Sequence, residues 1–103
     1  MNSIEFCAGA GGQALGLEQG GFHHNALVEI EPDFAATLRL NRPRWDVRCA
    51  DMQDFDGRPF AGTDLFAGGL PCPPFSIAGK QLGERDERNL FPAALRLIDE
   101  IRP

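Results

Sequence analysis

The sequence predicts an α/β fold in which a mostly parallel sheet is flanked by helices. Short apolar stretches that suit buried strands alternate with stretches that suit helices, in the order β-α-β-α-β-β-loop-α. A glycine-rich turn follows the first of these strands, and an acidic residue lies at the end of the second. Strands that alternate with helices are joined by right-handed crossovers, which place the strands parallel in one sheet.

The first predicted strand, residues 3–8, leads into a glycine cluster at residues 9–12. A helix is predicted over residues 13–19, and Gly20-Gly21 ends it. Glycines let the backbone approach a ligand closely, and the N-terminus of a helix presents free N–H groups. This arrangement is typical of a nucleotide-type cofactor site, and a tight strand-to-helix turn without a ligand is the alternative.

Glu29 lies at the end of the second predicted strand, residues 25–30. It follows the glycine turn by about 20 residues, which is the spacing of a carboxylate that binds ribose hydroxyls. The two signals together favour the cofactor interpretation. The alternative for Glu29 is a solvated side chain at a strand end.

Proline and an acidic residue suit the first turn of the helix predicted over residues 31–41. Residues 45–49 form a predicted third strand, which delivers Asp51 to a loop. Residues 54–59 are polar and are expected to form a turn.

Cys72 lies between Pro71 and Pro73, shortly after a predicted fourth strand at residues 63–67. Proline fixes φ and has no backbone N–H, so the cysteine cannot continue the strand pairing. The thiol is then held at the carboxyl end of a strand, where ligands bind in open α/β sheets. This pattern indicates a positioned nucleophile or, alternatively, a buried structural cysteine.

Residues 76–88 are polar and interrupted by glycines, which is typical of a functional lid or a disordered segment. Apolar residues then recur at helical spacing over residues 90–101, where Asn89 is a candidate cap and Pro92 falls in the first turn. We expect this last helix to face the core.

The composition indicates one small domain with a modest core, because the chain has 103 residues of which 43% are hydrophobic. The net charge of −5 argues against a basic nucleic-acid surface, so any DNA contact must come from a local loop or from other segments. Cys7, Cys49 and Cys72 are widely spaced and form no metal-ligand pattern, which favours a reducing, cytoplasmic setting. We see no signal peptide and no apolar run of membrane-spanning length.

Several stretches, taken in order, resemble the N-terminal half of the catalytic domain of DNA cytosine-5 methyltransferases. Cys7-Ala8-Gly9-Ala10-Gly11-Gly12 resembles the family's S-adenosylmethionine loop. Val28-Glu29-Ile30 resembles the motif whose acid holds the ribose hydroxyls and whose next residue packs on adenine. Ala50-Asp51-Met52 resembles the motif whose aspartate meets the adenine amino group.

The later motifs fit the same family. The stretch from Gly69-Leu70-Pro71-Cys72 to Phe75-Ser76 resembles its Pro-Cys nucleophile motif, and residues 79–81 and 86–91 resemble the loop and the motif that follow. The resemblance implies an incomplete Rossmann-like, S-adenosylmethionine-dependent methyltransferase fold. It implies cofactor contacts by Cys7, Ala8, Gly9, Gly11, Gly12, Glu29, Ile30, Asp51, Met52, Pro71 and Leu90. It also makes Ser76, Lys80 and Arg88 candidates for contacts to DNA phosphates.

The implied chemistry is methyl transfer to C5 of a cytosine that has left the base stack. The Cys72 thiolate adds to C6 of the base, C5 then attacks the methyl group of S-adenosylmethionine, and elimination restores the ring. A free thiol has a pKa of about 8.5, so the cysteine needs local activation. Double-stranded DNA is the implied partner, in the setting of restriction-modification.

The chain departs from the family at two places. Glu5-Phe6-Cys7 stands where the family usually has Asp-Leu-Phe, so Cys7 offers adenine a smaller contact than the usual aromatic ring. Phe6 is one position away and is expected to point to the other face of the strand. Pro73 replaces a common glutamine, which tightens the loop and leaves the chemistry untouched.

We expect residues 1–103 to be the N-terminal part of the cofactor-binding catalytic domain. The family's Glu-Asn-Val and Gln-x-Arg-x-Arg motifs, its target recognition domain and its C-terminal helix are not among these residues. The chain alone is therefore expected to be inactive, and exposed apolar surface is expected to favour self-association.

Three other functions are considered for the chain. It could be a non-catalytic remnant or interaction module, or an RNA cytosine-5 methyltransferase. A nicotinamide-dependent oxidoreductase is also possible, although the Pro-Cys motif argues against it.

Overall fold

The structure is a computed structural model that describes residues 1–70 and 90–103. Its elements are β1 (Asn2–Phe6), α1 (Gly12–Gln19), β2 (His23–Glu29), α2 (Pro32–Asn41), β3 (Val47–Cys49), the 3₁₀ helix η1 (Arg58–Phe60), β4 (Leu65–Gly68) and α3 (Phe91–Ile101). The four strands form one parallel sheet in the order β3-β2-β1-β4. The predicted α/β class with a parallel sheet is therefore confirmed.

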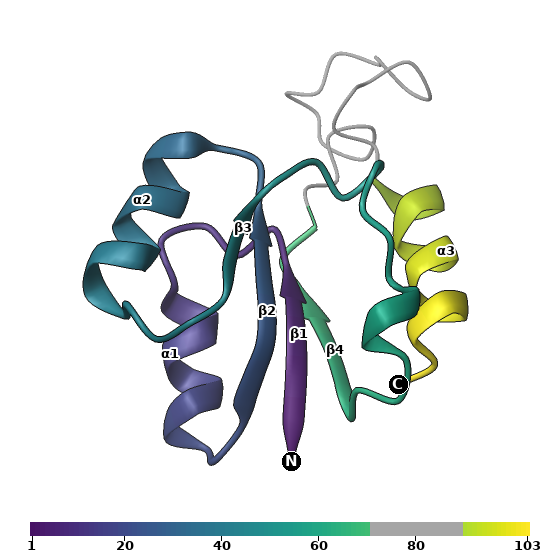
Figure 1. The fold of residues 1–103 in the computed structure, drawn as a ribbon, viewed down its shortest axis with the longest axis horizontal. Coiled ribbons are helices and arrows are strands. Elements are labelled where there is room, and N and C mark those ends of the chain that lie inside the picture. The colour runs from purple at the N-terminus through teal and green to yellow at the C-terminus, as the bar shows by residue number, and fades with distance from the viewer. Residues whose placement is uncertain (71–89) are drawn as a thin grey trace, which may run out of the picture.

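The sheet separates two layers of helices. Figure 1 shows α1 and α2 on one side of the sheet and α3 on the other. Among the described residues no helix is long and apolar enough to cross a membrane.

Side chains of the central strands alternate between the two layers, as the pleat of a strand requires. Ile4 and Phe6 are fully buried in the core beneath α3, where they meet Leu97 and Ile101. Leu27 belongs to the second core, which contains residues of α1 and α2. Each sheet face thus has its own apolar layer.

The register brings the carboxyl ends of the strands to one edge of the sheet. Phe6 at the end of β1 lies opposite Val28 of β2 and Gly68 of β4. Glu29 at the end of β2 lies opposite Cys49 of β3. The loops that follow all four strands therefore begin at the same edge.

The predicted elements are confirmed, with shifts of one or two residues at several ends. β3 begins at Val47 rather than at residue 45, because Trp45 closes a turn by donating its backbone N–H to the Arg42 carbonyl. β4 begins at Leu65 rather than at residue 63, because the Thr63 N–H closes a turn onto the Phe60 carbonyl. The 3₁₀ helix η1 was not predicted, since its residues read only as polar turn material.

The start of the last helix differs from the prediction. α3 has its N-cap position at Leu90, with no side-chain cap hydrogen bond. Asn89, the predicted cap, lies outside the described residues and one position before the cap. Pro92 falls in the first turn, as predicted.

Candidate cofactor site

Three of the four loops at the carboxyl edge carry the predicted cofactor residues. Cys7 to Gly11 follow β1, Glu29 ends β2, and Asp51 follows β3. The negative charges of Glu29 and Asp51 both act on the Cys7 thiol, which places the three side chains in one neighbourhood. The fold therefore brings together residues that are up to 44 positions apart in the chain, from Cys7 to Asp51.

The glycine turn has an unusual backbone. Cys7, Gly9 and Gly11 all have positive φ angles, of 55°, 61° and 102°. A Cβ on Gly11 would lie 2.7 Å from Cδ2 of Leu38, so any other residue here would displace the Leu38 side chain and strain a backbone at φ of 102°. Cys7 is one of two non-glycine residues with positive φ in the described chain, and such strain is typical of functional turns.

Glu29 holds the glycine turn in place. Its side chain is buried, with only 6% exposed. Oε1 accepts the Gly9 N–H at 2.7 Å, and Oε2 accepts the Glu31 N–H at 2.9 Å. The alternative of a solvated strand-end side chain is therefore wrong, because the carboxylate links the glycine turn to the start of α2.

The two residues predicted to face adenine from β2 and β3 are accessible. Ile30, next to Glu29, is 57% exposed although it is apolar. Asp51 is partly exposed, and its Oδ1 accepts the Gln53 N–H at 2.9 Å in a tight turn. The hydrogen bond from Gln53 uses Oδ1 of Asp51 and not Oδ2.

Met52 has a different environment from the one its motif suggests. Its side chain is 3% exposed and belongs to the core beneath α3. Its Sδ lies 3.8 Å from Sγ of Cys7, and Leu90 packs against the same core. Met52 is therefore a core residue, and Cys7 and Leu90 pack against the core that contains it.

The Cys7 thiol is a poor nucleophile. Burial, and then the charges of Glu29 and Asp51, raise its pKa to about 11. The thiol is therefore neutral at pH 7, and it acts as a small apolar contact.

Phe6 belongs to the core beneath α3, and Cys7 packs against the same core, because β1 ends at Phe6 and Cys7 has a positive φ. Phe6 is fully buried, and its ring centroid lies 5.1 Å from that of Phe66 and 5.4 Å from that of Phe55. Phe6 therefore does not replace the missing aromatic contact at position 7.

Five of the predicted site residues lie outside the described residues, namely Pro71, Cys72, Ser76, Lys80 and Arg88. β4 ends at Gly68, opposite Phe6 of β1, so the chain leaves the sheet toward them at the carboxyl edge. Their roles stay predictions.

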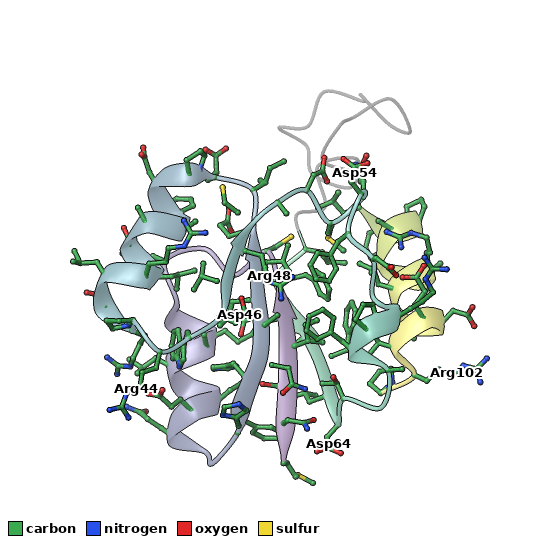
Figure 2. All side chains as sticks on the ribbon, in the orientation of Figure 1. Arg44, Asp46, Arg48, Asp54, Asp64 and Arg102 are labelled. Atoms are coloured by element: carbon green, nitrogen blue, oxygen red, sulfur yellow. The ribbon has the colours of Figure 1, made fainter. Side chains whose placement is uncertain are left out.

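Acidic side chains gather at this edge. Figure 2 shows Asp54 at the carboxyl end of the sheet and Asp64 at the opposite end. Asp51 and Asp54 lie in the loop that follows β3, and Glu29 ends β2 at the same edge. The described part of the edge is therefore unsuited to DNA phosphates, which agrees with the acidic composition.

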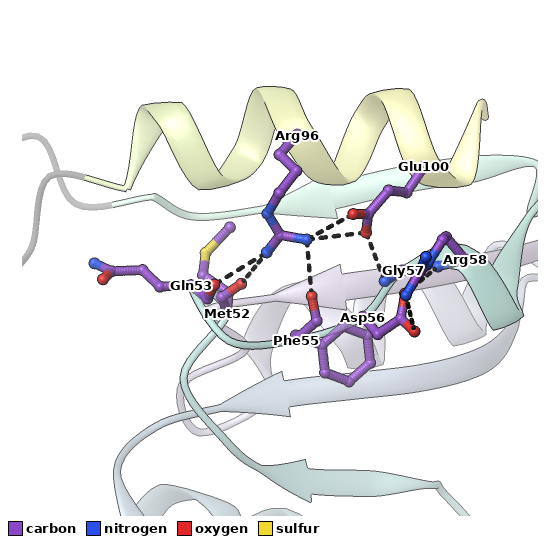
Figure 3. Close-up of polar contacts among 8 residues, drawn as sticks. All are labelled: Met52, Gln53, Phe55, Asp56, Gly57, Arg58, Arg96 and Glu100. Atoms are coloured by element: carbon purple, nitrogen blue, oxygen red, sulfur yellow. Dashed lines mark hydrogen bonds and ion pairs between the residues drawn. The ribbon is translucent and has the colours of Figure 1, made fainter.

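Sequence reasoning missed one pair of residues that bears on the site. Arg96 and Glu100 of α3 form an ion pair at 2.9 Å and bind the loop that follows Asp51 (Figure 3). The signal in the sequence was their spacing of four residues on one helix, which suits an ion pair but does not show what the pair touches.

Comparison with known proteins places this geometry in a family. The family model of the C-5 cytosine-specific DNA methylases matches residues 1–103. The Type II methyltransferase M.NgoMIV of Neisseria gonorrhoeae is 63% identical over 103 residues, which cover 100% of this chain and 33% of that protein. M.NaeI of Lentzea aerocolonigenes is 52% identical over 106 residues, covering 100% of this chain and 26% of that protein. The chain thus spans about a third or less of the length of these relatives.

Solved structures have the same fold. An Escherichia coli prophage protein described as a DNA modification methyltransferase has a TM-score of 0.82 at 30% identity, over 100% of this chain and 30% of its own. A mutant of DNMT2 from Spodoptera frugiperda has a TM-score of 0.76 at 23% identity, over 97% of this chain and 32% of its own, and supports the fold alone. The architecture is thus part of the Rossmann-like methyltransferase fold. Because the family model matches the whole sequence, the chain belongs to the C-5 cytosine-specific DNA methylase family.

Proposed function

We propose that this chain forms the S-adenosylmethionine-binding part of a DNA cytosine-5 methyltransferase whose nucleophile is Cys72. The observation that carries the proposal is the buried Glu29 carboxylate, which joins the glycine turn to α2 at the carboxyl edge of the sheet. A ligand at this edge would meet an acid, a positive-φ glycine turn and an exposed apolar side chain within one neighbourhood.

The residues at the edge fit the adenosine half of that cofactor. The Glu29 oxygens each accept one N–H and keep lone pairs for ribose hydroxyls. Ile30 offers an exposed apolar surface to adenine, and Asp51 offers an acceptor for its amino group. No heavy atom lies within 4 Å of where a Cβ on Gly9 would stand, which leaves space beside the turn for a ligand.

The chemistry requires a thiolate that adds to the cytosine ring. S-adenosylmethionine supplies the methyl group. In our proposal, Cys72 forms a bond to C6 of the flipped base, which makes C5 electron-rich enough to take up a methyl group. Loss of the C5 proton and departure of the Cys72 sulfur then restore the aromatic ring. The described edge is acidic and repels phosphates. We therefore assign the phosphate contacts to the polar and basic residues Ser76, Lys80 and Arg88.

The 103 residues by themselves are proposed not to complete this reaction. Relatives that carry methyltransferase names are about three times as long or more. Most of the cofactor contacts that we propose fall on described residues of this chain, and the acids that follow β3, Asp51 and Asp54, do not suit DNA phosphates. We therefore assign cofactor binding to this chain and DNA binding largely to regions of the full protein beyond these residues.

A covalent trapping experiment tests the assignment of Cys72. The protein expressed from its natural gene is incubated with S-adenosylmethionine and a DNA duplex that contains 5-fluorocytosine. Fluorine at C5 cannot leave as a proton does, so the adduct persists and shifts the protein band on a denaturing gel. Cys72→Ser should abolish the shift.

The matched control is Cys49→Ser, which removes an exposed thiol that contacts the Ile30 carbonyl but has no covalent role in our proposal, and it should leave the shift unchanged. A persistent adduct in Cys72→Ser would overturn the assignment. So would the absence of any adduct in the wild-type protein together with no binding of S-adenosylhomocysteine.

A further inference from the structure

Arg96 of α3 binds the loop that follows β3 through three backbone carbonyls (Figure 3). Its Nη2 donates to the carbonyl of Met52 at 3.0 Å and to that of Gln53 at 3.2 Å. Its Nη1 donates to the carbonyl of Phe55 at 3.0 Å. One guanidinium therefore gathers three carbonyls from four successive residues, which only the planar fork of arginine can do.

Glu100 fixes the orientation of that guanidinium. Both of its carboxylate oxygens lie 2.9 Å from Nη1 of Arg96. Oε1 also accepts the N–H of Gly57 at 2.8 Å. The hydrogen bond from Gly57, followed by that from Arg96, lowers the pKa of Glu100, so the carboxylate is charged at neutral pH. The pair thus contacts both ends of the 52–57 segment.

An independent observation shows that this segment is pressed against α3. Gly57 is buried, and a Cβ there would lie 2.9 Å from Cγ1 of Ile101 and 3.0 Å from Cδ2 of Leu97. Only a residue without a side chain allows the backbone to approach the helix so closely. The segment is therefore held to α3 by hydrogen bonds at one end and by close packing at the other.

The 52–57 segment begins immediately after Asp51, and hydrogen bonds of one turn connect its first residues to Asp51. Asp51 Oδ1 accepts the Gln53 N–H, and the Asp54 N–H donates to the Asp51 carbonyl at 3.0 Å. The N–H groups of this turn thus point to Asp51, while two of its carbonyls point to Arg96. Replacing the Arg96 guanidinium would release the carbonyls of this turn, and we therefore expect the Asp51 side chain to move with the turn.

We propose that Arg96, oriented by Glu100, is a positioning residue that sets the Asp51 carboxylate for recognition of the adenine amino group. This inference rests on the proposed function, in which Asp51 meets that group. Arg96 touches neither the cofactor nor the base. Its effect should appear in the preference for adenine over other nucleobases, because that preference depends on the position of the Asp51 carboxylate, which accepts the amino group.

The test compares two ligands on the protein expressed from its natural gene. Dissociation constants are measured for S-adenosylhomocysteine and for its inosine analogue, in which a carbonyl oxygen replaces the amino group. The wild-type protein should prefer the adenine compound. Arg96→Gln should reduce the ratio of the two constants by about tenfold, which corresponds to the loss of one well-placed hydrogen bond. Arg96→Lys should retain part of the ratio, since an ammonium reaches fewer of the carbonyls.

Arg58→Gln is the matched control. Arg58 lies just after the same segment, but its side chain is exposed and pairs only with Asp56 at 2.9 Å among the described contacts. Its substitution should leave the ratio unchanged. Glu100→Gln tests whether Glu100 orients the guanidinium, and we expect a smaller fall in the ratio than for Arg96→Gln. This variant takes the place of Arg96→Gln if the latter does not fold.

The outcomes separate the two claims. If the wild-type protein binds neither ligand, the proposed function fails and this inference fails with it. If the wild-type protein discriminates but Arg96→Gln weakens both ligands equally, the proposed function stands and the positioning role is overturned. A ratio that falls in both α3 variants and not in Arg58→Gln establishes it.

Discussion

Two buried glutamates on neighbouring strands have opposite surroundings. The Glu29 carboxylate accepts two backbone N–H groups, from Gly9 and Glu31. Glu5 is 1% exposed, and its Oε1 has no hydrogen-bond partner within residues 1–70 and 90–103. Burial alone raises the pKa of Glu5 to about 7. The residue type is the same in both cases, so the fold decides whether the buried side chain finds hydrogen-bond partners.

Glu5 should make the stability of the chain depend on pH. Its pKa in the folded state is about 7, above the ordinary value of 4.5. The stability contributed by the neutral carboxyl is therefore fully present below about pH 4.5 and is lost as the pH rises through 7. Glu5→Gln should be more stable than the wild-type protein at pH 8 by about 3 kcal/mol, and this difference should shrink toward pH 4.5.

Urea unfolding of both proteins across this pH range measures the difference. Glu31→Gln, whose side chain is exposed, is the control and should show no such trend. A difference between Glu5→Gln and the wild-type protein that stays constant from pH 4.5 to pH 8 would contradict the expectation.

At the scale of elements, the glycine turn and α2 pack directly on each other. Gly11 precedes α1 with φ of 102°, and it faces Leu38 of α2, which is 1% exposed. Glu29 reinforces the contact by accepting the N–H of Glu31 at the start of α2. The turn that receives the cofactor in our proposal is thus part of the packing between two helices and the sheet.

Gly11→Ala should destabilise the chain by about 2 kcal/mol or more, because a side chain is strained at this φ and its Cβ would displace Leu38. Gly16→Ala is the matched control in α1. A Cβ there meets open space, and alanine favours the helix, so we expect a gain of up to about 1 kcal/mol. Thermal and urea unfolding measure both changes. Equal stabilities for the two variants would show that the turn tolerates a side chain.

At the scale of the whole molecule, one layer of the structure has an apolar outer surface. Leu95 is 68% exposed and Ile98 is 41% exposed on α3, and they lie on neighbouring turns. Within the described residues, β4 is paired on one side only, with β1. An apolar helix face above an unpaired strand edge favours association with another surface.

The isolated 103-residue chain should therefore self-associate. Sedimentation velocity should show an average mass that rises with concentration, and replacing Leu95 and Ile98 with glutamate should remove most of this rise. Leu40→Glu is the control, because Leu40 is 80% exposed on α2, on the other side of the sheet. A mass that stays at that of one chain at all concentrations would refute the prediction.

The class of the fold, the order of its elements and the family can all be inferred from the amino-acid sequence. Alternation of apolar strands with helices is a local pattern, so the parallel sheet and the element ends, to within two residues, could be predicted from it. The glycine turn and Glu29 were predicted as parts of one site because their spacing is a property of a strand, a turn and a helix in succession.

Contacts between groups on distant segments became visible once the chain was folded. Met52 turned out to be core, the Cys7 thiol to be neutral, and Arg96 to bind the loop of Asp51, 45 positions earlier in the chain. None of these has a signature in local spacing, since each depends on how α3 and the loops after β1 and β3 pack together at the sheet. Burial and hydrogen bonding arise when the chain closes on itself, and so charge states and positioning contacts are properties of the fold rather than of any single motif.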